Sequence, residues 1–196
     1  MNQPDLRGEA GPFLLWLAFK GTVSQEQIVE RWGSDPSTDV LVKTLLADGL
    51  IGEDDGYIFL EDGGDDFLSE ISRGALSDSD RVDFEAFVSN FEPVDTAVKR
   101  AVTQWQQGRG GGALGEEALG AVDDWMDAHA RLHDIVASSA PVVGTILEPY
   151  LPGLDAAVLR FEAGDLDAFT GGDDDSYHSQ WFVMHELILR CGGIRR

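Results

Sequence analysis

Cysteine, positive charge and long apolar runs are all scarce in this sequence, and each scarcity excludes a class of protein. A single cysteine, Cys191, cannot form an internal disulfide, which excludes a fold held together by disulfide bridges. No stretch joins a basic start to an uninterrupted apolar run, as a signal peptide or membrane span would require. We therefore expect a cytoplasmic protein without a membrane-spanning segment.

Lysine and arginine number only 14 against 36 aspartate and glutamate residues, so the net charge is −22. A surface this acidic repels phosphate backbones and anionic lipids. Hydrophobic residues nevertheless make up 43% of the 196 residues, which is enough for one or two domains with a buried core. The composition predicts a folded, acidic protein.

The first part of the chain has the local signals of two short helices. Apolar residues at 13–19 predict a helix that ends at Gly21. Ser24, with Gln27 three residues later, has the spacing of a capping box and predicts the start of a second helix. Gly33 is expected to end that helix.

A third helix and a hairpin are predicted next. Asp35 followed by Pro36 is typical of a helix start, and Gly49 is expected to end the helix. An Asp-Gly pair at residues 55–56 separates two short apolar segments, the pattern of a tight turn between two strands.

This order of elements resembles the winged-helix domain of the MarR type. The resemblance lies in "LVKTLLADGL" at 41–50 and "IGEDDGYIFLEDGGDDFL" at 51–68. It implies a winged helix-turn-helix domain over residues 10–75, in which the third helix reads the DNA major groove and the hairpin, or wing, contacts the DNA backbone. If this chain binds DNA in that way, the candidate contact residues are Arg31, Lys43 and Arg73.

The charge of this segment argues against DNA binding. Residues 1–75 hold five lysines and arginines against fifteen aspartates and glutamates, a net charge of −10. Lys43 is the only cation between residues 35 and 49, and the expected wing carries Glu53, Asp54 and Asp55. A DNA-binding winged helix makes several phosphate contacts, which acidic side chains oppose. We therefore expect a protein partner and no nucleic acid.

The second region, residues 81–196, follows a polar segment at 76–80 that is interpreted as a linker. The predicted fold is thus mainly α: an N-terminal winged helix-turn-helix with a small β-hairpin, followed by a C-terminal helical bundle. The bundle is expected to pack on the first domain or to form a homodimer interface. Helices are predicted at 84–105, 114–138, 142–150, 154–164 and 181–191.

The helical region resembles a module of actinobacterial winged-helix proteins and of some pyruvate phosphate dikinase-like or phosphoenolpyruvate-utilising proteins. The segments that carry this resemblance are "FEPVDTAVKRAVTQWQ" at 91–106, "DAHARLHDIV" at 127–136 and "DSYHSQWFVMHELI" at 175–188. The resemblance implies a phosphoenolpyruvate-utilising enzyme as a partner. The phosphohistidine and phosphoenolpyruvate-barrel segments of those enzymes are not found in this sequence, so their phosphotransfer reaction is not implied.

All four histidines lie in the helical region, as two pairs with helical spacing. His129 and His133 are four residues apart, and His178 and His185 are seven apart with Glu186 adjacent, so each pair shares a helix face. Two such helices could bring four imidazoles to one ligand or metal ion. The alternative, which we favour, is that the histidines pack the helices together and form separate hydrogen bonds.

No catalytic motif is found. Gly110, Gly112 and Gly115 form a GxGxxG pattern, but a helix is predicted before it where a dinucleotide site needs a strand. We predict no catalytic residue and no cofactor. The expected function is a non-catalytic regulatory or adaptor protein that recognises a protein or a small ligand. The alternatives are a MarR-like ligand-responsive transcriptional regulator and a metal-binding helical enzyme.

Overall fold

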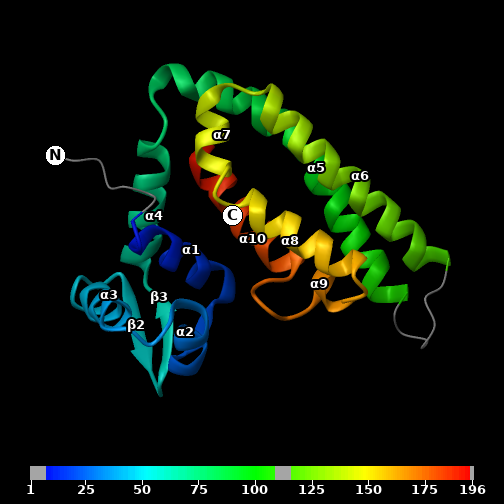
Figure 1. Cartoon of the computed structure of the whole chain (residues 1–196). Coiled ribbons are helices and arrows are strands. Elements are labelled where there is room, and N and C mark those ends of the chain that lie inside the picture. The colour runs from blue at the N-terminus through cyan, green and yellow to red at the C-terminus, as the bar shows by residue number, and fades with distance from the viewer. Residues whose placement is uncertain (1–7, 109–115, 195–196) are drawn as a thin grey trace. The chain divides into compact units, whose positions relative to one another are not determined.

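The computed structural model describes residues 8–108 and 116–194, which form a mainly helical chain with a small three-stranded antiparallel sheet (Figure 1). The glycines of the GxGxxG pattern lie outside the described residues. The chain divides into two compact units, one of Met1–Ser77 with Glu186–Arg196 and the other of Asp78–His185. We call them the N-terminal unit and the helical unit.

This division differs from the predicted domains, which assigned all of 81–196 to the helical bundle. The last residues cluster with the N-terminal unit, and within it Arg190 binds α4 (Asp62–Gly74). Its Nη2 donates to Asp65 Oδ1 at 2.6 Å, and its Nη1 to Ser69 Oγ at 3.2 Å. No local pattern in the sequence predicts a contact between residues so far apart.

The first three helices of the N-terminal unit end at or within two residues of the glycines expected to end them, and the second and third begin at their predicted capping residues. They are α1 (Ala10–Lys20), α2 (Gln25–Trp32) and α3 (Pro36–Ala47). Ser24 and Gln27 form the expected capping box at the start of α2. The carboxylate of Asp35 accepts hydrogen bonds from two backbone amides in the first turn of α3. These local predictions are confirmed.

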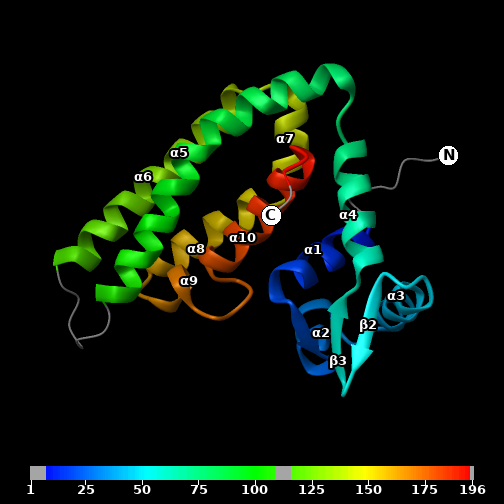
Figure 2. The same ribbon diagram turned by 180° about the vertical axis from the view of Figure 1, so that it is seen from behind.

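The sheet consists of β1 (Thr22–Ser24), β2 (Ile51–Asp54) and β3 (Tyr57–Leu60), in the order β1-β3-β2. The predicted hairpin is β2–β3 (Figure 2). Its turn places Asp55 and Gly56 at φ 49° and 80°. Glycine adopts such positive φ values freely, and aspartate tolerates them. β1 was not predicted, since three residues are too short to show an alternating pattern.

The core of the N-terminal unit is formed by α1, the sheet, the inner faces of α2 and α3, and α4 (Asp62–Gly74). Trp16, Leu17, Ile28 and Leu45 are among its buried residues. On α3, Val42 is also buried, whereas its apolar neighbours Leu41 and Leu46 are only half-buried. The apolar residues of α3 cover more than one face, so their spacing alone did not fix which face is buried.

The helical unit is built on two long helices, α5 (Asp78–Gly108) and α6 (Glu116–Ser138). They lie side by side in both views, and their chains run in opposite directions (Figures 1 and 2). A linker was predicted at residues 76–80, but residues 78–80 already form the first turn of α5. Buried residues recur at spacings of three and four along both helices, as in a coiled coil. On α6 they are Ala118, Ala121, Trp125, Ala128 and Leu132.

Four further helices lie between residues 141 and 191: α7 (Pro141–Leu147), α8 (Leu151–Glu162), α9 (Asp167–Thr170) and α10 (Tyr177–Cys191). α9 was not predicted, and α10 begins four residues before the predicted start at Trp181. Aromatic ring contacts link α5, α6 and α10. Phe91 stacks on Trp181 with ring centroids 5.4 Å apart, Trp181 stacks on Tyr177 at 5.8 Å, and Trp125 of α6 meets Tyr177 edge to face at 5.0 Å. These rings fix the first turns of α10 in the helical unit.

No single helix within residues 8–108 and 116–194 has both the length and the apolar character needed to cross a membrane. α7 and α8 reach these limits only when taken together, across a 60° bend.

Candidate functional site

The histidines His129 and His133 lie at the edge of the buried stripe of α6. Each follows a buried position, Ala128 and Leu132 respectively, so each side chain leaves the helix beside the core. The side chain of His129 is 14% exposed and that of His133 is 39% exposed. The two rings meet edge to face with centroids 4.8 Å apart. Helical spacing thus places both imidazoles together at a border between core and solvent.

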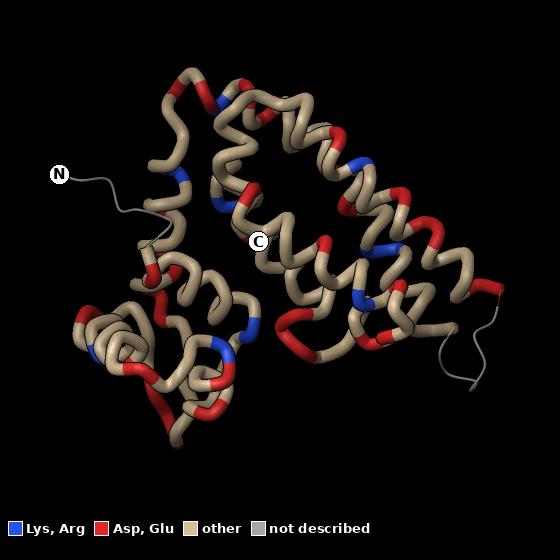
Figure 3. The backbone as a smooth tube through the Cα atoms, viewed as in Figure 1, with Lys and Arg blue, Asp and Glu red and all other residues tan. Residues whose placement is uncertain are grey.

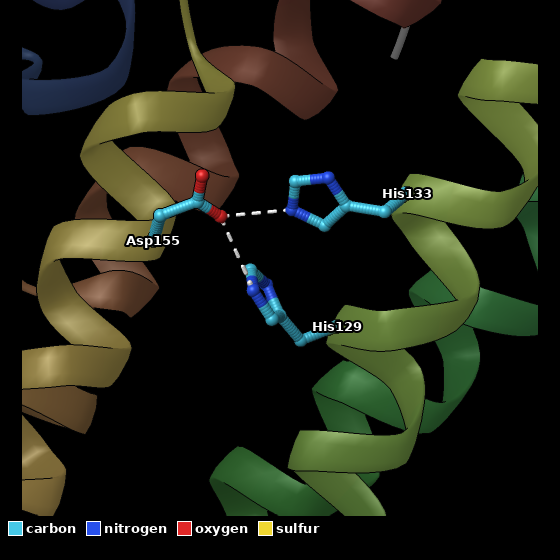
Figure 4. Close-up of side chains that lie close together, drawn as sticks. All are labelled: His129, His133 and Asp155. Atoms are coloured by element: carbon cyan, nitrogen blue, oxygen red, sulfur yellow. Dashed lines mark hydrogen bonds and ion pairs between the residues drawn. The ribbon is translucent and has the colours of Figure 1, made fainter.

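A carboxylate on another helix faces both rings. Asp155, on α8, lies 2.8 Å from His133 Nε2 and 3.3 Å from His129 Nε2, measured to the same oxygen, Oδ1 (Figure 4). One potential ligand atom from each of the three residues lies within 4.8 Å of the other two. We call these three residues the His-Asp cluster. The side chain of Asp155 is 45% exposed, so the cluster is open to solvent.

The second ring nitrogen of His129 has a separate partner. The hydroxyl of Tyr177, from the first residue of α10, lies 3.3 Å from His129 Nδ1. Burial raises the pKa of Tyr177, so this hydroxyl stays neutral. Burial also lowers the pKa of His129, the neighbouring His133 lowers it further, and Asp155 partly opposes both. Burial and His133 thus favour the neutral imidazole of His129, the form that can bind a metal ion.

His178 and His185 are placed elsewhere in the helical unit. The ring of His178 packs edge to face against Phe182, with centroids 4.7 Å apart, and burial lowers its pKa. His185 is buried, and its Nε2 lies 3.5 Å from Oδ2 of Asp95, on α5. Neither belongs to the His-Asp cluster. The structure therefore brings together one of the two predicted histidine pairs with an acid that the sequence did not single out.

Glu186, the remaining ligand candidate, is engaged in an ion pair. Its Oε1 accepts a hydrogen bond from Arg190 Nε at 2.8 Å, one helical turn away on α10. Arg190 is nearly buried and also binds Asp65. Glu186 thus helps to neutralise a buried guanidinium in the N-terminal unit.

Asp95 is the centre of a buried polar network between α5 and α10. Its Oδ1 accepts from Trp181 Nε1 at 3.1 Å, and its Oδ2 accepts from Lys99 Nζ at 2.6 Å. His185 lies against Oδ2. A buried carboxylate with this many partners is well satisfied, which indicates a structural role.

The three candidate DNA contacts lie on different helices of the N-terminal unit: Arg31 on α2, Lys43 on α3 and Arg73 on α4. Arg73 Nε donates to the backbone carbonyl of Ser69, and Arg73 lines a cavity together with Arg190 and Glu186. Acidic residues lie within the β2–β3 hairpin, where the backbone tube is red in Figure 3.

Asp155 and the hydroxyl of Tyr177 are the site features that sequence reasoning missed. Asp155 follows Leu154 at the start of the helix predicted at 154–164, and no motif there marks this acid as a ligand. Comparisons of the chain with protein-family models, with curated proteins and with solved structures found no significant match in any of the three.

Proposed function

We propose that this protein is a non-catalytic regulatory or adaptor protein whose N-terminal unit is a winged helix that binds a cationic surface of a partner protein. The proposal is supported by the order of α1–α3, the β2–β3 hairpin and α4, which is the order expected of that fold. In this interpretation α3 corresponds to the recognition helix and the hairpin to the wing.

The observation that carries the proposal is the set of side chains that α3 and the β2–β3 hairpin expose to solvent. Val40 on α3 is 63% exposed, and Tyr57 at the hairpin turn is 53% exposed. The remaining exposed residues of these elements are mostly acidic or uncharged, with Lys43 as the one cation among the described residues of α3 and the hairpin. The exposed acids are Asp39, Glu53, Asp54 and Asp55.

Exposed apolar side chains among acids suit a protein surface better than a duplex. Aromatic residues are enriched in protein–protein interfaces, whereas phosphates require cations or hydrogen-bond donors. Charge complementarity therefore points to a partner surface rich in lysine and arginine. The resemblance of the helical region suggests a phosphoenolpyruvate-utilising enzyme as the first partner to examine.

The discriminating experiment is a fluorescence-anisotropy titration of the protein with random duplex DNA at about 50 mM and about 200 mM salt. We expect a Kd weaker than about 10⁻⁴ M at the higher salt concentration. Micromolar binding that weakens steeply between the two salt concentrations would contradict the proposal and favour the MarR-like transcriptional regulator.

The partner itself can be sought with a photo-crosslinking amino acid at position 57, in the cells that make this protein. Val82, a 69% exposed residue of the helical unit, provides the matched control position. We expect a protein crosslink at position 57 that is absent at position 82 and that weakens in the double variant Asp54→Asn/Asp55→Asn. Crosslinks to nucleic acid alone, or the same products at both positions, would refute the proposed interface.

A further inference from the structure

We propose that His129, His133 and Asp155 bind one divalent transition-metal ion, with at least one coordination position left to water or a small ligand. This site goes beyond the proposed function and does not depend on it. It lies entirely within the helical unit, whereas the proposed partner surface lies in the N-terminal unit.

The geometry of the His-Asp cluster is close to that of a ligand set. In a tetrahedral zinc site with bonds of about 2.0–2.2 Å, neighbouring ligand atoms are about 3.3–3.6 Å apart. His129 Nε2 is already 3.3 Å from Asp155 Oδ1, and His133 Nε2 is 2.8 Å from the same oxygen. None of the three ligand atoms is more than 4.8 Å from another. Small rotations of the half-exposed His133 and Asp155 side chains would bring all three to bonding distance.

Tyr177 provides the supporting contact that metal-binding histidines usually have. When Nε2 of a histidine binds a metal, the proton resides on Nδ1, which then needs an acceptor. Tyr177 Oη lies 3.3 Å from His129 Nδ1, and a hydroxyl can accept as well as donate. The same tyrosine can therefore satisfy His129 both without the metal and with it. The ring stack of Tyr177 on Trp181 holds this hydroxyl in position.

The donor atoms indicate the class of metal. Two imidazole nitrogens with one carboxylate suit Zn²⁺ and other late first-row ions, whereas Mg²⁺ and Ca²⁺ prefer oxygen ligands. Three protein ligands are one fewer than a closed structural zinc site contains. The exposure of Asp155 leaves room for a water molecule or a small anion at the remaining position.

The test must separate this site from the general attraction of cations to a chain of net charge −22. We would titrate the metal-free, full-length protein with Zn²⁺ by calorimetry and with Co²⁺ by visible absorption, in the presence of excess Mg²⁺. Mg²⁺ occupies sites made only of carboxylates and competes weakly for imidazole. We expect one ion per chain and a Co²⁺ spectrum that indicates nitrogen ligands.

Variants assign the ligands. His133→Asn and Asp155→Asn each replace a partly exposed ligand side chain. Loss of a residue that only supports a ligand lowers metal affinity by about 10–100-fold, and these two variants should lower it by more. His178→Asn is the matched control, since it removes a histidine of the same unit outside the cluster, and it should leave the affinity unchanged. Circular dichroism and thermal unfolding without metal verify that each variant folds.

Tyr177→Phe tests the supporting hydroxyl and keeps the buried ring. We expect an affinity about 10–100-fold lower, with the stoichiometry unchanged. Three results would overturn the proposal: no Zn²⁺ or Co²⁺ binding under excess Mg²⁺, equal affinity in the wild type and in both ligand variants, or a Co²⁺ spectrum with oxygen ligands only.

Discussion

Removal of the Asp95 carboxylate should destabilise the helical unit far more than removal of an exposed carboxylate. Asp95 is 8% exposed and accepts hydrogen bonds from Trp181 and Lys99. In Asp95→Ala the indole N–H of Trp181 loses its partner, and an unsatisfied buried donor costs about 1–3 kcal/mol. Breaking a fully buried ion pair costs about 3–5 kcal/mol. Lys99 is 40% exposed and can regain water, so we expect a total of about 2–4 kcal/mol.

Asp124→Ala provides the matched control. Asp124 lies on α6 and pairs with Arg100 of α5 at 2.9 Å, but the two side chains are 43% and 58% exposed. Exposed ion pairs of this kind contribute about 0–1 kcal/mol. Both variants thus remove a carboxylate paired with a cation of α5, and they differ chiefly in burial.

The assay is urea unfolding of the full chain, followed by circular dichroism and by tryptophan fluorescence. Two probes are needed because the chain has two compact units, and separate unfolding of the units would invalidate a two-state fit. A double-mutant cycle of Asp95→Ala with Trp181→Phe should show a coupling energy of about 0.5–3 kcal/mol, since the indole donor is absent from the partner variant. A cost for Asp95→Ala below about 0.5 kcal/mol, or one equal to that of Asp124→Ala, would refute the structural role of this network.

Three further predictions concern stability. Leu45→Ala, at a 3% exposed position of α3, should cost about 2–5 kcal/mol in urea unfolding, and a loss below about 0.5 kcal/mol would contradict its burial. Gly64→Ala should cost about 1–3 kcal/mol because its methyl group would collide with the carbonyl oxygen of Leu50, whereas Gly120→Ala, in an open position of α6, should stabilise by about 0.5–1 kcal/mol. Burial lowers the pKa values of His129 and His178, so the unfolded chain binds protons more tightly. This contribution to stability is therefore fully present only well above about pH 6.5, the ordinary pKa of histidine, and is lost as the pH falls through that value toward the lowered ones; in His178→Asn the loss over this range should be smaller.

The N-terminal unit was the easier half to predict, because its signals are local. A capping box spans four residues and a hairpin turn spans two, so Ser24, Asp35 and Gly56 could be interpreted without knowledge of the rest of the fold. β1 could not be predicted in this way. It exists because Val23 pairs with Ile58 of β3, a contact between distant segments that leaves no periodic signal.

The His-Asp cluster shows where such reasoning ends. The spacing of His129 and His133 was sufficient to predict a shared face, because one helix contains both. The third member, Asp155, lies near them only because α8 packs against α6. The sequence does not show which residues of two separate helices will lie opposite each other. The same helical spacing placed His178 and His185 on one face, and the ring of Phe182 does contact both, yet only His185 also meets Asp95. A ligand set divided between helices therefore depends on packing, and sequence spacing can supply only the part of it that one helix carries.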